Sequence, residues 1–226
     1  MHYQIWLGQV VKFTKNDRSG CAIGDFVEIG QNFRRFLRML CEVSGTVINR
    51  SEIGRSLAAS EAAVRDYLDL AEGTFLWRSI GSLEKTASKS LVKLPRGYIR
   101  DSGLLCHLKG VRNLEQLLTW PGVGSAFEGH IIEEILLGLA AVESISWPAA
   151  YYRTRGGLEV DLVLTHPTGV RIPIEIKFGM ATKRSDLNSL AAFIEQENCP
   201  YGILVNNSEE IRLLTPQILQ IPAGCL

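Results

Sequence analysis

The residue types best suited to chemistry lie on two neighbouring apolar segments in the second half of the chain. The first, residues 158–165, carries Asp161, and the second, residues 170–178, carries Glu175 and Lys177. The sequence His-Pro-Thr-Gly between them is typical of a turn, so the two segments predict a β-hairpin. Because side chains alternate between the two faces of a strand, Glu175 and Lys177 share one face.

The pairing register of this hairpin decides whether the two carboxylates meet. Counting back from the turn places Asp161 opposite either Ile174 or Glu175. In the second register the carboxylates lie side by side, with Cβ atoms about 5 Å apart. Such oxygen ligands suit Mg²⁺ or Mn²⁺, which can activate water at a phosphodiester, while Lys177 positions the nucleophile or stabilises developing charge. The competing interpretation is a surface hairpin whose acids and lysine form screened ion pairs.

A fourth acid precedes the hairpin on a helix that we predict over residues 125–144. At 100° per residue, the apolar face of this helix consists of Ile131, Ile132, Ile135, Leu136 and Leu139. Glu128 falls near the middle of that face. The other polar residues nearby, His130, Glu133 and Glu134, fall away from it. A carboxylate that faces a core is costly unless it is paired or binds a metal, so we assign Glu128 to the site. The alternative is that this first-turn acid reaches solvent and stabilises the helix N-terminus.

Three further segments complete the predicted second domain, residues 121–226. A strand is predicted over residues 151–155, a helix over 186–197 and a strand over 201–206. With the first helix and the hairpin they give the order α-β-β-β-α-β. The Pro- and Gly-rich stretch at 120–124 marks the domain boundary.

Residues 31–120 predict a winged helix-turn-helix domain. Apolar residues recur at helical spacing from Asn32 onward. Two shorter helices follow, with Ser51 and Ser60 as their N-caps, and Gly73 closes the second. Two strands then surround a polar loop, and a capped helix follows them. These boundaries are strands over 75–80 and 91–99, the loop over 81–90, and Asp101 as the cap. The order of three helices and a hairpin is that of a winged helix.

Residues 1–30 form an unassigned N-terminal segment. Within it, residues 5–13 fit either a helix or a strand, and residues 16–24 predict a loop.

The winged helix carries an unusual charge pattern for a DNA-binding module. Its predicted recognition helix holds four acids and one base, namely Glu61, Arg65, Asp66, Asp69 and Glu72. Since phosphate neutralisation by Lys and Arg supplies much of DNA affinity, we favour a role in packing or in binding a protein partner. The preceding helix carries Arg34, Arg35 and Arg38, which either contact a nucleic-acid backbone or form a solvated face, the interpretation we prefer.

Composition places the chain among ordinary globular proteins. Its 226 residues are 46% hydrophobic and 21% charged, which excludes a disordered chain and a disulfide scaffold. Net charge is zero, but residues 1–120 hold 17 basic and 12 acidic residues, whereas residues 121–226 hold 7 and 12. Five scattered cysteines and the absence of a signal sequence or a membrane-spanning stretch predict a cytoplasmic protein. No pattern predicts the oligomeric state.

A helix Glu, then Asp, then Glu-x-Lys on a hairpin resembles the PD-(D/E)XK nuclease superfamily, which has the restriction-endonuclease-like fold. The segments FRRFLRML, VRDYLDLAEGTFLWRSI, SLVKLPRGYIRDSGLL, GSAFEGHIIEEIL, YYRTRGGLEVDLVL and IPIEIKFG resemble the C-terminal half of a prokaryotic family of predicted AAA+ ATPases. In that family a P-loop module precedes a winged helix and a nuclease-like domain of unknown function. The fold class implied is α/β (α+β), with a mixed sheet in the second domain.

The resemblance implies roles for particular residues. Glu128, Asp161 and Glu175 match the metal-binding acids and Lys177 the motif lysine. Nucleic-acid contacts are assigned to Arg153, Arg155, Lys183 and Arg184, against the alternative that they are simply solvent-exposed. The chain departs from the family because it contains no G-x-x-x-x-G-K-[ST], so no ATP site is expected.

Two functions follow as hypotheses. The first is a Mg²⁺- or Mn²⁺-dependent endonuclease that acts on DNA. The second is a non-catalytic nucleic-acid-binding or regulatory module, whose partner is an ATPase supplied by another chain.

Overall fold

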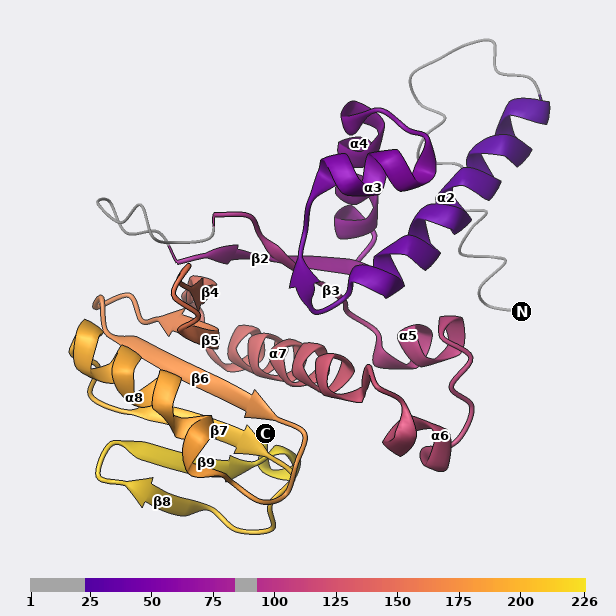
Figure 1. The fold of residues 1–226 in the computed structure, drawn as a ribbon. Helices are drawn as coiled ribbons and strands as arrows, with labels where there is room; N and C mark the ends of the chain where they lie inside the picture. The colour runs from indigo at the N-terminus through magenta and orange to yellow at the C-terminus, as the bar shows by residue number, and fades with distance from the viewer. Residues whose placement is uncertain (1–22, 84–92) are drawn as a thin grey trace.

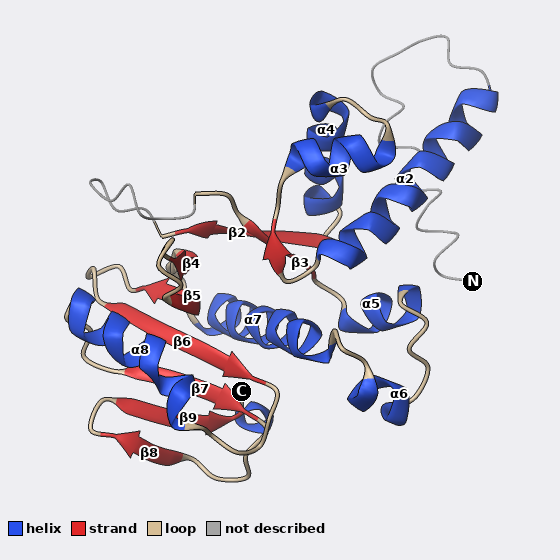
Figure 2. Cartoon of the chain, viewed as in Figure 1, coloured by secondary structure: helices blue, strands red, loops and turns tan. Residues whose placement is uncertain are grey.

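The computed structural model describes residues 23–83 and 93–226, which form a mixed α/β structure (Figures 1 and 2). Its α-helices are α2 (Ile23–Val43), α3 (Arg50–Leu57), α4 (Glu61–Gly73), α5 (Ser102–Leu108), α6 (Leu114–Thr119), α7 (Val123–Val142) and α8 (Arg184–Glu197). Its strands are β1 (Thr46–Val47), β2 (Trp77–Ser82), β3 (Arg96–Ile99), β4 (Ala149–Arg153), β5 (Glu159–Thr165), β6 (Arg171–Lys177), β7 (Gly202–Asn206), β8 (Arg212–Thr215) and β9 (Ile218–Pro222). The predicted α+β class is confirmed.

The strands of the described residues form one mixed sheet in the order β1-β3-β2-β4-β5-β6-β7-β9-β8. The predicted order α-β-β-β-α-β is present as α7-β4-β5-β6-α8-β7. Strands β8 and β9 extend the sheet beyond the predicted elements. The parallel pairing of β2 with β4 joins the two parts of the chain, so the sheet is continuous across the predicted boundary at residue 121.

Helices α7 and α8 cover opposite faces of the central strands. Ile131 of α7 belongs to a buried cluster with Leu162 of β5, whereas Phe193 of α8 belongs to another with Val163. Adjacent residues of a strand point to opposite faces, so each helix supplies its own core layer. A third buried cluster lies among the N-terminal helices and includes Phe36 and Trp77.

Helix caps in the N-terminal part follow local side-chain chemistry. The Ser60 hydroxyl accepts from the Ala63 N–H and the Asp101 carboxylate accepts from the Leu104 N–H, so both predicted caps are confirmed. Helix α4 ends at Gly73, also as predicted. The cap predicted at Ser51 is wrong: Asn49 accepts from the N–H groups of residues 51 and 52, so the N-cap lies two residues earlier.

The β2–β3 hairpin departs from its predicted bounds where it is described. The Trp77–Ser82 strand continues two residues into the predicted loop, and its partner begins at Arg96 rather than residue 91. Most of the loop and the start of the second predicted strand lie outside the described residues, as do residues 1–22. Helix α2 begins at Ile23, so the predicted loop over 16–24 is too long at its end.

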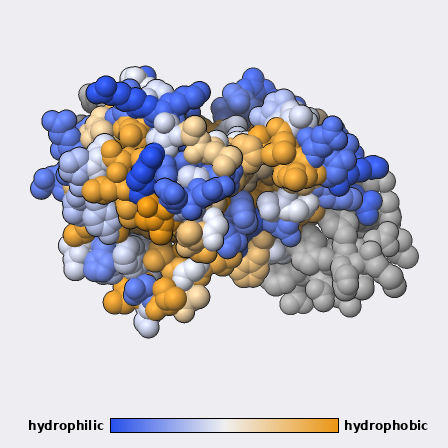
Figure 3. All heavy atoms as spheres, turned by 90° about the horizontal axis from the view of Figure 1, so that it is seen from below, coloured by the Kyte–Doolittle hydropathy of each residue, from blue (hydrophilic) through white to orange (hydrophobic). Residues whose placement is uncertain are grey.

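No helix among the described residues is long and apolar enough to cross a membrane. Large exposed apolar side chains lie on several elements, among them Leu118 of α6, Leu137 of α7 and Leu213 of β8. The face in Figure 3 correspondingly shows apolar areas separated by polar ones.

Candidate functional site

The pairing register of the β5–β6 hairpin decides which side chains of the predicted site lie opposite each other. Its ladder runs from the pair Thr165 and Arg171 to the pair Leu162 and Ile174. Gly169 supports the turn with φ +88°, a left-handed conformation that glycine adopts without strain. The next pair in this register is Asp161 with Glu175, and the ladder stops before it.

Asp161 bridges the two strands where their ladder ends. Its Oδ2 accepts the backbone N–H of Ile176 at 2.9 Å, so a side chain replaces the backbone acceptor of a regular pair. On its other side, β5 departs from regular pairing with β4: Ala150 pairs with Val163, but Tyr152 pairs with Val160. This bulge adds one residue to β5 beside Asp161 and turns that side chain.

The bulge also breaks the regular alternation of side chains along β5. Regular alternation places Asp161 and Val163 on one face, together with Glu159. Instead, Val160 and Val163 lie in the same buried cluster with α8. The extra residue between them interrupts the period of two.

Glu175 and Lys177 lie directly beside Asp161. The Lys177 Nζ is 2.5 Å from Glu175 Oε1 and 4.0 Å from Asp161 Oδ2. Both carboxylates are only 6% exposed, and Glu175 Oε2 is buried without a hydrogen-bond partner. The three predicted hairpin residues are therefore brought together, with one carboxylate oxygen left unsatisfied.

Glu128 reaches the same group from α7. Its Oε1 accepts from Tyr98 Oη at 2.5 Å and from Arg96 Nη1 at 2.9 Å. Arg96 Nη1 also lies 3.6 Å from Asp161 Oδ1. The helix acid thus faces the hairpin acids, with a guanidinium between them.

Burial is the main cause of the raised pKa values of the acids in this cluster. Desolvation, reinforced by the charge of Asp161, raises the pKa of Glu128 to about 7 and that of Glu175 to about 8. Desolvation also raises the pKa of Asp161. For Lys177, burial works against the charged form, but Asp161 and Glu175 outweigh it and the pKa is raised. Added positive charge is therefore favourable here near neutral pH.

Two residues of the cluster, Arg96 and Tyr98 on β3, were not predicted from the sequence. Arg96 is 4% exposed, forms a third ion pair with Glu159, and lies with Cζ 5.2 Å from the ring centroid of Tyr151. In the sequence, Arg96 is only a charged residue within a predicted strand. That pattern does not reveal its contacts with Glu128 and Asp161, which lie 32 and 65 positions later in the chain.

The predicted nucleic-acid residues lie outside this buried cluster. Arg153 is partly exposed and pairs with Glu159 at 3.4 Å. Arg155 is exposed in the turn after β4. Lys183 and Arg184 are exposed where α8 begins. All four side chains are accessible to solvent.

Glu133 of α7 is buried although it falls away from the predicted apolar face. It is 4% exposed and pairs with both Arg78 and Arg100, the latter at 3.0 Å. The β2–β3 hairpin packs against a flank of the helix that its apolar face does not define. Contact from a second element, rather than helix periodicity, decides this burial.

Two of the acids fit a hydrated divalent cation. The unpartnered oxygen of Glu175 lies next to Asp161, and Mg²⁺ is commonly held by one or two carboxylates with waters completing its coordination. Glu128 faces Arg96 and Tyr98 instead. Accordingly, among the described residues no three His, Cys, Asp or Glu side chains are grouped so as to hold a metal.

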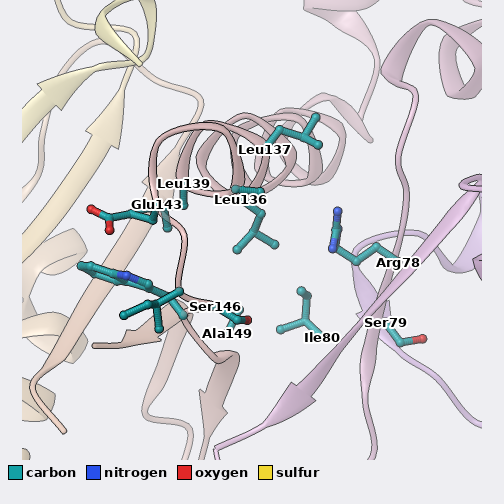
Figure 4. A pocket seen from close by; sticks show the side chains of 12 residues that line it. Arg78, Ser79, Ile80, Leu136, Leu137, Leu139, Glu143, Ser146 and Ala149 are labelled. Carbon is teal, nitrogen blue, oxygen red and sulfur yellow. The ribbon is translucent and has the colours of Figure 1, made fainter. Parts of the chain in front are cut away.

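A cavity of about 520 Å³ lies away from these acids, between α7, β2 and the start of β4 (Figure 4). Leu136, Ile80 and Trp147 line it together with Arg78. Since none of the predicted site residues lines it, we do not assign it to the candidate site.

The two parts of the chain match two sequence families. Residues 25–115 match the family described as Domain of unknown function (DUF8612), and residues 123–226 match Domain of unknown function (DUF4143). Uncharacterized protein Rv2008c of Mycobacterium tuberculosis and Uncharacterized protein Mb2031c of Mycobacterium bovis are each 31% identical over 129 residues, which is 57% of this chain. The match covers 28% of either relative. The chain is thus similar, part by part, to two domain families of unknown function.

Proposed function

We propose that the protein is a Mg²⁺- or Mn²⁺-dependent nuclease that hydrolyses DNA phosphodiesters. The observation that carries this proposal is the convergence of Asp161, Glu175 and Lys177 where β5 and β6 separate, with one buried carboxylate oxygen unpartnered. The resemblance to the PD-(D/E)XK pattern supports the same proposal.

Each residue has a distinct role in this proposal. Asp161 and Glu175 hold the cation, which supplies activation of water and stabilisation of the leaving oxygen when bound. Lys177, whose side chain is 40% exposed, reaches from the carboxylates towards solvent, where it orients the attacking water or stabilises charge on the phosphate. Glu128 of α7 is the third acid of the predicted site, and it accepts hydrogen bonds from Arg96 and Tyr98.

The exposed cations provide contacts for the nucleic-acid backbone. Arg153, Arg155, Lys183 and Arg184 offer charge that binds phosphates without reading sequence. We therefore expect the affinity of the protein for DNA to fall as the salt concentration rises.

A second candidate is a non-catalytic module that binds nucleic acid or regulates an ATPase supplied by another chain. The observation that favours it is the engagement of Glu128 by Arg96 and Tyr98, which leaves the acidic set partly neutralised. The resemblance to the C-terminal half of AAA+ family proteins supports an ATPase as the partner.

A cleavage assay separates the two candidates. Wild type, Lys177→Ala and Lys109→Ala are incubated with linear, supercoiled and four-way-junction DNA in Mg²⁺ or Mn²⁺. Lys109 pairs with Glu42 far from the hairpin and is a matched lysine control. We expect cleavage by wild type and by Lys109→Ala, and a loss of about 100-fold or more in Lys177→Ala.

Cleavage that survives in Lys177→Ala would indicate a contaminating nuclease or another site. An absence of cleavage on every substrate, with no Mn²⁺ binding by calorimetry, would overturn the nuclease proposal and favour the interaction module.

A further inference from the structure

Arg96 is a cation built into the acidic cluster from the other part of the chain. Its Nη1 donates to Glu128 Oε1 at 2.9 Å and lies 3.6 Å from Asp161 Oδ1, while its Nη2 pairs with Glu159. The side chain is almost completely buried, although its Nε has no hydrogen-bond partner. Three carboxylates therefore share one guanidinium.

The guanidinium lies where a cation held jointly by Glu128 and Asp161 would have to lie. Opposite charges at this separation attract strongly in a poorly solvated site, and two cations repel each other equally strongly. A divalent ion beside Asp161 and Glu175 is therefore disfavoured as long as Arg96 stays in place. The unpartnered Oε2 of Glu175 points to a ligand position that Arg96 does not satisfy.

We propose that Arg96 is the resident counter-ion of the metal-free protein, and that a divalent cation binds by displacing its guanidinium from Glu128 and Asp161. This inference rests on the proposed function, since it assigns the control of the same carboxylate site. Glu159, with 31% of its side chain exposed, remains as a carboxylate partner for the displaced guanidinium.

The position of Arg96 in the fold connects the site to the winged-helix hairpin. Arg96 begins β3, which pairs with β1 and β2, and Tyr98 of the same strand donates to Glu128. Metal binding is therefore coupled to the placement of β3 against α7. Any partner that shifts this hairpin would change the affinity of the site for the ion.

Calorimetric titration with MnCl₂ tests this competition directly. Arg96→Gln removes the charge but keeps a hydrogen-bond donor for Glu128, and Arg96→Lys keeps the charge but loses the planar fork that spans several carboxylates. Arg171→Gln is the matched control, because Arg171 begins β6 at the far end of the hairpin from the cluster and pairs with Glu197 of α8.

We expect Arg96→Gln to bind Mn²⁺ about tenfold or more tightly than wild type, and Arg96→Lys to fall between them. Arg171→Gln should bind as wild type does. Adding Asp161→Asn to Arg96→Gln should abolish the gained affinity, which places the ion at the cluster. Circular dichroism checks that each variant is folded.

Unchanged or weaker Mn²⁺ binding in the folded Arg96 variants would overturn the proposal. Failure of both Arg96 variants to fold would also overturn it, because the guanidinium would then be required by the fold and could not be displaced. Tighter binding without DNA cleavage would support this inference while refuting the nuclease function. Cleavage that depends on Lys177, with no change in affinity, would do the reverse.

Discussion

Glu175 is the residue at which burial and chemistry conflict most clearly. Its carboxylate has Lys177 on one oxygen and no partner on the other, and its pKa is raised from 4.5 to about 8. A folded state that holds a proton more tightly than the unfolded chain loses stability as pH rises between the two values. In the metal-free protein, ionisation of Glu175 above neutral pH therefore lowers the stability of the folded state.

We predict that Glu175→Gln removes part of this pH dependence. In EDTA, the wild-type free energy of unfolding should fall as pH rises from about 5 to about 8.5, because the folded carboxyl loses its proton over that range. The variant should fall less. Urea titrations at several pH values measure the difference, with the exposed Glu134→Gln as control. Equal decline in Glu175→Gln and wild type would contradict the prediction.

At the residue scale, the sequence carried enough information to select the hairpin acids and their lysine. Asp161, Glu175 and Lys177 stand out because charged residues interrupt strongly apolar strands. Arg96 could not be found in this way, because its role depends on contacts with residues distant in the sequence. Long-range ion pairs leave no local pattern.

At the scale of elements, α7 is fixed by charges on one side as well as by an apolar face. Glu133 joins it to Arg78 of β2 and to Arg100 after β3. This contact holds the helix that carries Glu128 against the hairpin that carries Arg96. The alignment of the two strands and the helix is thus part of what positions the site.

We predict that Glu133→Ala destabilises the protein by about 2–4 kcal/mol, because it leaves two partly buried arginines without their shared carboxylate. Glu134→Ala, one residue away with 53% of its side chain exposed, should change stability by less than about 0.5 kcal/mol. Urea denaturation measures both. Equal effects would show that the Glu133 ion pairs contribute no more than a surface contact.

Close backbone packing adds a second constraint on β3. A Cβ built on Gly97 would lie 1.8 Å from the Trp77 ring, so only glycine lets these two strands pair with the indole in place.

Some local features of the elements were predicted from the sequence, such as the helix caps at Ser60 and Asp101. Strands β8 and β9 were not predicted, since their pairing with the sheet depends on β7.

For the whole molecule, the sheet and the buried clusters unite the two parts of the chain. Ile80 of β2 and Tyr98 of β3 lie in the same buried cluster as Ile131 and Leu162. Together with the pairing of β2 and β4, this sharing makes the hairpin a structural component of the candidate site. The charge difference between the halves, +5 against −5, is consistent with Arg96 entering an acidic cluster.

The sequence predicted the fold class and the order of the central elements because hydrophobic periodicity is local. It did not predict how the two parts meet, because the β2–β4 pairing and the contacts of Arg78, Arg96 and Tyr98 with Glu133 and Glu128 join residues that are distant in the sequence. A difference in net charge between the halves was visible in the sequence, but no pattern assigned ion-pair partners across them.

The most direct measurement is anomalous diffraction from crystals of the wild-type protein soaked in MnCl₂. We predict an anomalous peak beside the carboxylates of Asp161 and Glu175, with the Arg96 guanidinium no longer hydrogen-bonded to Glu128. The absence of a peak at these carboxylates, with Arg96 still bound to Glu128, would contradict a metal-dependent site in this protein.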